Sequence, residues 1–163
     1  MNLIGQAARC GEPFWVADKA RHEMFQPGMF RTLERPIVLG VNHAVCRCRT
    51  SGRIDIDPTL VLASTEDGTL VLEADDHGLF FHAHVPPNAC VAHGDTPPYN
   101  ILDAIRADQC RGVSIHGHGG ERLIGPDVPA DVFVWASMRI VELSLTLPPV
   151  TACGSPGTWV RES

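Results

Sequence analysis

A chain of 163 residues, 44% of them hydrophobic and 20% charged, can bury one sizeable core and has the composition of a single globular domain. Its net charge of −6, with one lysine (Lys19) among 13 basic residues, argues against nucleic acid as a ligand, because phosphate binding needs clustered cations. No apolar run reaches the roughly 18–20 residues of a membrane span, and the N-terminus lacks a signal-peptide pattern. We therefore expect a soluble cytoplasmic protein with neither a membrane nor a nucleic acid as partner.

Three strands are predicted in the first half of the chain. Residues 37–41 (IVLGV) are rich in β-branched residues and follow Pro36. Residues 69–73 and 79–85 form two further apolar runs, and the Asp/Gly content of residues 74–78 between them is typical of a hairpin turn. This pattern predicts a buried strand followed by an antiparallel hairpin.

One helix is predicted with a capping residue at its start. Residues 100–111 carry Asn100 as N-cap, and Gly112 is placed to end the helix. Residues 113–115 (VSI) then read as a strand that begins directly after the helix terminus.

The remaining elements indicate a mainly β (α+β) domain. A strand is predicted over 132–147, broken near Ser137, and a second, shorter helix is indicated around 27–33. We expect one domain over residues 1–152, a barrel or sandwich with helices packed outside, followed by a loose tail over 153–163. Without an export signal, the cysteines are expected to be free thiols (Cys10, Cys46, Cys48, Cys90, Cys110 and Cys153).

Three polar residues on or beside predicted strands could form an activated-serine site. Ser114 follows the predicted helix and a glycine, His43 closes the strand that ends at Val41, and Glu142 lies on the polar side of the last strand. A serine hydroxyl needs a base to take its proton, and a carboxylate can orient that base. Ser114 is thus the candidate nucleophile, His43 the base and Glu142 the orienting carboxylate.

Four stretches, in order along the chain, resemble one family. They are residues 23–30 (EMFQPGMF), 38–43 (VLGVNH), 61–81 with Gly-Thr-Leu and Gly-Leu-Phe-Phe, and the pair formed by 112–114 (GVS) and 142–145 (ELSL) before two prolines. In this order and spacing they are similar to the prohead (procapsid maturation) serine proteases of tailed phages, distant relatives of the herpesvirus assemblin.

The resemblance implies an assemblin-like fold, a closed β-barrel with flanking helices. It implies a serine endopeptidase that cuts scaffold and major capsid proteins inside the assembling prohead, in the host cytoplasm, and that also cleaves itself. It further implies catalytic roles for Ser114 and His43, a homodimer or higher homo-oligomer, and no cofactor. The family usually continues after the serine with a small residue and an aromatic one. This chain departs from that pattern: Gly117 fits it, whereas His116 and His118 are unusual and could perturb or supplement the site.

Secondary candidates surround the proposed triad. Ser144 lies beside Glu142 on the polar face and could hydrogen-bond to the site or act as a second nucleophile. Donors for an oxyanion hole could come from the glycine-rich loop that begins at Gly117 or from Arg139.

Two other functions stay open at this point. His82 and His84, and likewise His116 and His118, are pairs two residues apart, which a strand would place on one face. Together these four histidines could bind zinc or iron in a small β-barrel enzyme. Alternatively, the chain could be a catalytically silent subunit of capsid assembly with the same fold.

Overall fold

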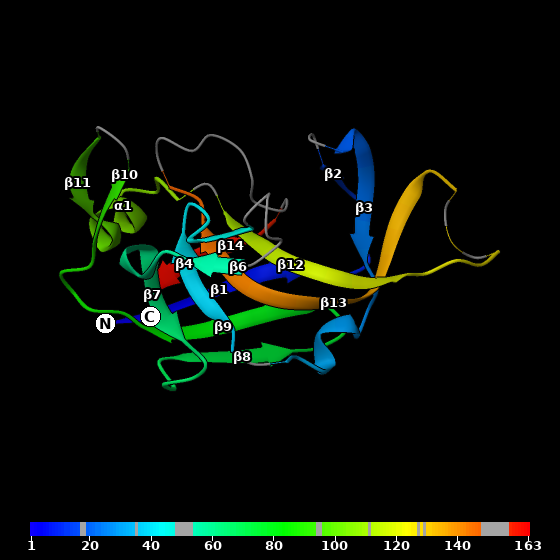
Figure 1. Cartoon of the computed structure of the whole chain (residues 1–163), viewed down its shortest axis with the longest axis horizontal. Helices are drawn as coiled ribbons and strands as arrows, with labels where there is room; N and C mark the ends of the chain where they lie inside the picture. The colour runs from blue at the N-terminus through cyan, green and yellow to red at the C-terminus, as the bar shows by residue number, and fades with distance from the viewer. Residues whose placement is uncertain are drawn as a thin grey trace.

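The computed structural model describes residues 1–16, 19–34, 36–47, 54–93, 96–110, 112–126, 128, 130–147 and 157–163. Most of these residues lie in strands, and the single α-helix among them is α1 (Ile101–Arg106). Figure 1 shows the strands arranged around the long strand β13, with α1 at one end of the molecule. None of the helices in the described ranges has the length and apolar character needed to cross a membrane.

One sheet has four antiparallel strands in the order β14-β1-β9-β8. These are β14 (Trp159–Glu162), β1 (Asn2–Arg9), β9 (Gly78–His84) and β8 (Leu70–Ala74). The β8–β9 pair confirms the hairpin predicted around residues 74–78. The end of the chain pairs along β1 as strand β14, so this part of the segment expected to be loose belongs to the sheet.

The second sheet is built on β13 (Val132–Leu145), which is fourteen residues long and pairs with three other strands. Its first four residues pair in parallel with β3 and its last four in parallel with β4, while β12 runs antiparallel along it. The partners in this sheet are β2 (Phe14–Val16), β3 (Arg21–Phe25), β4 (Val38–Val41), β7 (Val61–Ser64) and β12 (Val113–Arg122).

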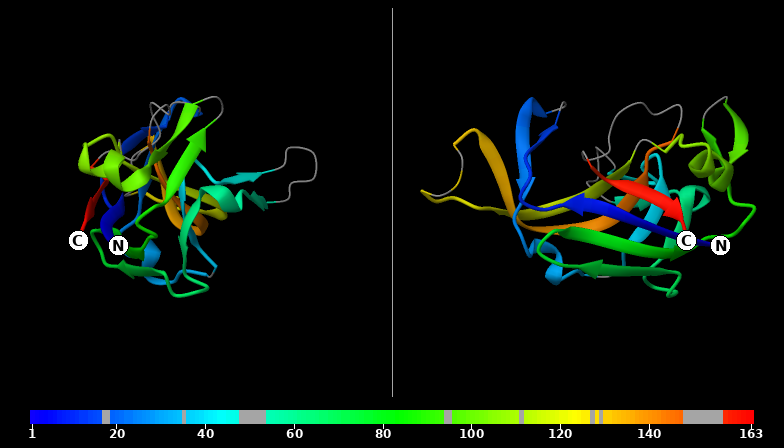
Figure 2. Two further views of the ribbon diagram at one scale, coloured as in Figure 1. Left: turned by 90° about the vertical axis from the view of Figure 1, so that its left-hand side faces the viewer. Right: turned by 180° about the vertical axis from the view of Figure 1, so that it is seen from behind.

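Two small hairpins and two 3₁₀ turns complete the described structure. Strands β5 (Val45–Arg47) and β6 (Ile54–Ile56) form a hairpin that projects from the body of the protein (Figure 2). The other hairpin and the turns are β10 (Cys90–His93) with β11 (Thr96–Asn100), η2 (Met29–Arg31) and η3 (Pro58–Leu60).

The core lies between the two larger sheets. Leu3 and Phe81 from the four-stranded sheet belong to the same buried cluster as Leu39 and Leu143 from the other sheet, and Ile101 of α1 closes one end. Each of these five side chains is completely or almost completely buried. Burying a side chain of this size contributes roughly 1.5–3 kcal/mol, so packing between the sheets is the main source of stability.

The structure corrects several expectations. The closed barrel with flanking helices is wrong, because both large sheets are open in the described residues and one six-residue α-helix packs beside them. That helix ends at Arg106 instead of residue 111, since the chain turns at Asp108, whose φ is 56°. The helix expected around 27–33 is the 3₁₀ turn η2, and β13 continues unbroken through Ser137. Asn100 is confirmed as the N-cap of α1.

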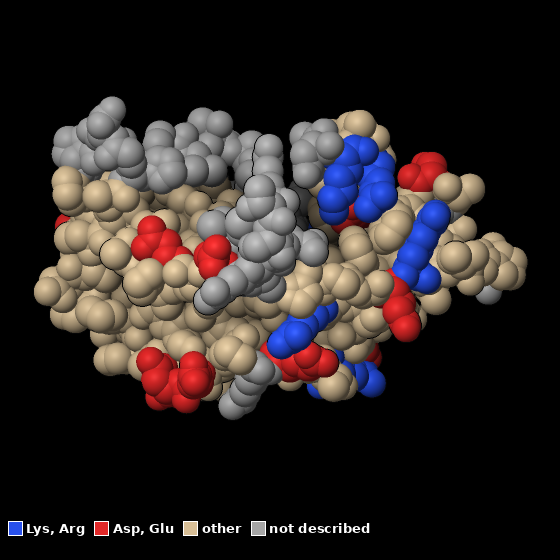
Figure 3. All heavy atoms as spheres, viewed as in Figure 1, with Lys and Arg blue, Asp and Glu red and all other residues tan. Residues whose placement is uncertain are grey.

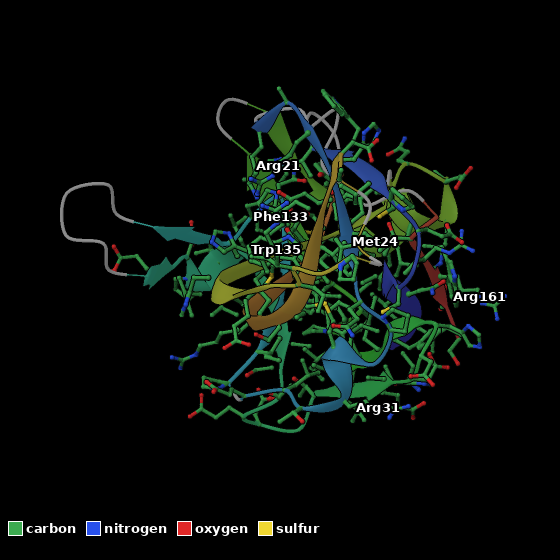
Figure 4. All side chains as sticks on the ribbon, turned by 90° about the vertical axis from the view of Figure 1, so that its right-hand side faces the viewer. Arg21, Met24, Arg31, Phe133, Trp135 and Arg161 are labelled. Carbon is green, nitrogen blue, oxygen red and sulfur yellow. The ribbon has the colours of Figure 1, made fainter. Side chains whose placement is uncertain are left out.

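An ion-pair cluster holds β3 against the start of β13. Glu23 is buried, and its carboxylate accepts hydrogen bonds from the Trp135 indole (2.7 Å), from Arg21 (2.8 Å) and from Lys19 (3.0 Å). The Arg21 guanidinium also lies over Phe133, 4.0 Å from the ring centroid; both residues are labelled in Figure 4. Lys and Arg side chains gather over β2 and β3 in Figure 3. These hydrogen bonds lower the pKa of Glu23 even though burial acts to raise it.

Candidate active site

The register between β12 and β13 places four polar side chains on one face. Ser114 lies opposite Ser144, and His116 lies opposite Glu142. Residues two apart on a strand share a face, and directly opposite residues of an antiparallel pair share it too. The hydroxyls, the imidazole and the carboxylate therefore form one polar patch where β12 and β13 pair.

A tight turn after β4 brings His43 to this patch. Asn42 and His43 both have left-handed backbone conformations, with φ of 50° and 65°. Asparagine tolerates this region better than most residues, and here its side chain also stabilises the turn. Its backbone N–H donates to the Leu145 carbonyl, and its side-chain oxygen accepts from the Leu147 N–H, each at 2.9 Å. The Asn-His pair thus reverses the chain at the end of a buried strand.

Two side chains of β13 hold the backbone of the turn. The His43 N–H donates to the Ser144 hydroxyl oxygen at 2.7 Å, and the Ala44 N–H donates to Oε1 of Glu142 at the same distance. Glu142 is fully buried and Ser144 is 1% exposed. These two hydrogen bonds attach the backbone of the turn to β13.

The His43 ring lies between the carboxylate and a second imidazole. Its Nδ1 is 3.9 Å from Oε2 of Glu142, and its centroid is 6.3 Å from that of His116 in an edge-to-face arrangement. Nδ1 is shielded from solvent and has no hydrogen-bond partner. Burial lowers the pKa of His43, and the nearby His116 lowers this pKa further. A lowered pKa favours the neutral imidazole, the form that can accept a proton.

Gly40 makes the position of the carboxylate possible. A Cβ atom added at Gly40 would lie 2.3 Å from Oε1 of Glu142 and 2.8 Å from the Cβ of Ala44. The absence of a side chain at Gly40 therefore leaves the space in which Glu142 meets the Ala44 N–H.

We expect Gly40→Ala to destabilise the protein by about 1–3 kcal/mol, the usual cost of overpacking a core, and to displace the Glu142 carboxylate. This sign is opposite to the ordinary effect of replacing glycine by alanine within a strand. Urea unfolding of both proteins measures the difference. Gly125→Ala is the matched control, because a Cβ there meets nothing within 4 Å, and its free energy of unfolding should change by less than about 0.5 kcal/mol. Equal stability of the two variants would contradict the packing described for Gly40.

The three residues predicted as a triad come to the same region. His43 and Glu142 approach to 3.9 Å, and the strand register brings Ser114, which is 8% exposed, onto the face that carries Glu142. Ser144 is part of the site, because its hydroxyl oxygen accepts a hydrogen bond from the backbone N–H of His43.

The secondary candidates for an oxyanion hole have other contacts. The guanidinium of Arg139 lies 3.2 Å from the Glu34 carboxylate, in an exposed ion pair. Gly117 allows close approach of β13, because a Cβ there would lie 2.5 Å from the Met138 sulfur. Nothing in these contacts supports either residue as an oxyanion donor.

The four histidines predicted as a possible metal site are divided between the two sheets. His82 and His84 lie on β9, where His82 is 4.0 Å from Glu73 and His84 is 3.0 Å from Asn2. His116 and His118 lie on β12. Within the part of the chain that the structure describes, the one group of three or more potential ligands that converges is His43, His116 and Glu142.

Sequence reasoning named His116 as a departure after the serine and as a possible metal ligand, but it did not place His116 opposite Glu142. The predicted strand ended at residue 115, whereas β12 continues to Arg122. The available signal was the spacing of two between Ser114 and His116, which places both on one face once the strand is extended. Comparison of the chain with models of known protein families, with curated proteins and with solved structures finds no match.

Proposed function

We propose that this protein is a serine endopeptidase in which Ser114 is the nucleophile, His43 the general base and Glu142 the carboxylate that orients the base. One observation supports this most strongly: the part-buried His43 imidazole, whose pKa is lowered by burial, lies 3.9 Å from the fully buried Glu142 carboxylate, and Glu142 shares its strand face with Ser114. A carboxylate next to an imidazole and a hydroxyl is the arrangement that serine hydrolases of unrelated folds share.

The roles of Ser114, His43 and Glu142 in peptide cleavage follow from the chemistry of their side chains. Oγ of Ser114 would attack the carbonyl carbon of the scissile peptide while His43 takes the hydroxyl proton, and the resulting imidazolium would be stabilised by Glu142. The same imidazolium would then protonate the leaving amine, and the acyl group on Ser114 would be hydrolysed by water. Ser144 and Gly40 would act as positioning residues, since one holds the His43 backbone and the other leaves room for Glu142.

The substrate class comes from the sequence resemblance alone. The similarity to prohead proteases favours scaffold and major capsid proteins as substrates, cleaved inside the prohead in the host cytoplasm, together with cleavage of the chain itself and a homo-oligomeric state. Short exposed strands such as β2 and β8 at the sheet edges offer backbone groups to which an extended peptide could pair.

Intact-mass analysis of the chain co-expressed with candidate capsid and scaffold proteins tests this function. We expect new N-termini in at least one of those proteins, and no cleavage when Ser114→Ala replaces the unaltered chain. Incubation of the purified chain with a peptide library prepared from a proteome provides the same test without knowledge of the partner. Co-purification of uncut capsid protein, with no cleaved peptides in the library, would instead indicate a silent assembly subunit.

A further inference from the structure

Three potential metal ligands converge in the candidate active site. One ligand atom each from His43, His116 and Glu142 lies within 4.8 Å of the other two. Two imidazoles and one carboxylate form a common ligand set of zinc enzymes, in which water occupies the fourth position. A zinc ion at about 2.1 Å from each atom needs ligand atoms roughly 3.4 Å apart, so the side chains need to close by about an ångström.

Neighbouring groups orient the potential ligands, as is common around bound metal ions. Oε1 of Glu142 is fixed by the Ala44 N–H, which directs the carboxylate, and its Oε2 lies 3.9 Å from Nδ1 of His43. That Nδ1 is shielded from solvent and has no hydrogen-bond partner, and a metal ion would supply the missing partner. Hydrogen bonds to first ligands commonly set their orientation and raise metal affinity.

The site is also open enough to admit an ion. The side chain of His43 is 35% exposed and His116 is half-buried, whereas Glu142 is fully buried. The carboxylate thus forms the floor of the patch and the two imidazoles its rim.

We propose that His43, His116 and Glu142 bind a divalent transition metal of the zinc class, and that the bound metal inhibits the enzyme by withdrawing His43 from Ser114. The binding depends only on the three ligands, whereas the inhibition rests on the proposed serine protease function. Bound metal would then hold the activity off, and release of the metal would switch it on.

Titration of the chelator-treated protein with Zn²⁺ and Co²⁺ tests the binding. We expect one equivalent to bind, with visible Co²⁺ absorption typical of tetrahedral coordination, and ring resonances of two of the eight histidines to shift on Zn²⁺ addition in NMR spectra. His116→Asn should weaken binding about tenfold or more. His118→Asn is the matched control on the same strand and should bind as the unaltered chain does. Equal loss in both variants, or no histidine shifts in the unaltered chain, would overturn the proposed site.

Labelling with a fluorophosphonate, with and without Zn²⁺, tests the inhibition. We expect Zn²⁺ to slow labelling of the unaltered chain and of His118→Asn at least tenfold, and a chelator to restore it. In His116→Asn the rate with Zn²⁺ should equal its own rate without Zn²⁺. Labelling that Zn²⁺ leaves unchanged in the unaltered chain would overturn the inhibition. Metal binding without any labelling in any condition would leave the site standing and contradict the serine protease function.

Discussion

Ser114→Ala is expected to abolish both fluorophosphonate labelling and peptide cleavage, with a loss of roughly 10³-fold or more in rate, because it removes the proposed nucleophile. The substitution keeps the Cβ atom and removes one oxygen from a residue that is 8% exposed. The free energy of unfolding should therefore change by less than about 1.5 kcal/mol, the usual worth of one hydrogen bond. Rate and stability would be measured on the same preparations.

Ser144→Ala is the matched control, because Ser144 lies directly opposite Ser114 in the register of β12 and β13. Its hydroxyl binds the His43 N–H, so this variant should be less stable by about 0.5–1.5 kcal/mol and should still be labelled. If Ser144→Ala abolished labelling and Ser114→Ala did not, the roles assigned to the two serines would be reversed.

Glu142→Gln is expected to reduce labelling and cleavage by about 10²–10⁴-fold while the chain stays folded. The amide oxygen of glutamine can still accept the Ala44 N–H, which Oε1 of Glu142 accepts in the unaltered chain. Its NH₂ group would face Nδ1 of His43 and donate to it. That hydrogen bond selects the tautomer with a proton on Nε2, which cannot take the serine proton. Steady-state kinetics and urea unfolding separate this effect from a loss of folded protein.

Glu73→Gln is the control for this variant. Glu73 is an exposed carboxylate that lies 4.0 Å from the exposed His82 imidazole. This distance is close to the 3.9 Å between Glu142 and His43 in the candidate site. It lies on the other sheet, and neither rate nor stability should change measurably, as is usual for exposed ion pairs. Labelling of Glu142→Gln at the rate of the unaltered chain would show that Glu142 only supports the turn.

Local sequence signals predicted those elements whose cause is local. The apolar run 37–41 and the turn residues 74–78 correspond to β4 and to the β8–β9 hairpin, and Asn100 caps α1 as expected. In each case the signal lies within a few residues of the feature that it specifies: β-branched residues, a turn, or a capping side chain. The turn at Asn42 and His43 also has a local cause, because asparagine accommodates the left-handed backbone conformation.

Pairing between distant segments was not predictable in this way. Strands β1 and β14 join residues from opposite ends of the chain, and the closed barrel expected from resemblance is replaced by two open sheets. The lengths of β12 and of α1 depend on tertiary pairing and on the turn at Asp108. A period of two in the sequence does not reveal which residue of one strand faces which residue of another.

The same limit applies to the candidate site. Ser114 and His43 could be chosen because each lies where a recognisable segment begins or ends, and Glu142 because it lies on the polar side of a predicted strand. The proximity of His116 to Glu142 could not be predicted, because it follows from the β12–β13 register. The role of Gly40 depends on contacts with Glu142 and Ala44, and Glu142 is about a hundred residues away along the chain.

Mapping of the fluorophosphonate adduct on the unaltered, folded chain tests the central claim most directly. The protein would be treated with a chelator, labelled, digested and analysed by mass spectrometry, with heat-unfolded protein as the control for non-specific reaction. We expect one adduct per chain, on the oxygen of Ser114, and none after unfolding. An adduct on another serine, or no adduct on the folded and metal-free chain, would contradict the assignment of Ser114 as a nucleophile activated by His43 and Glu142.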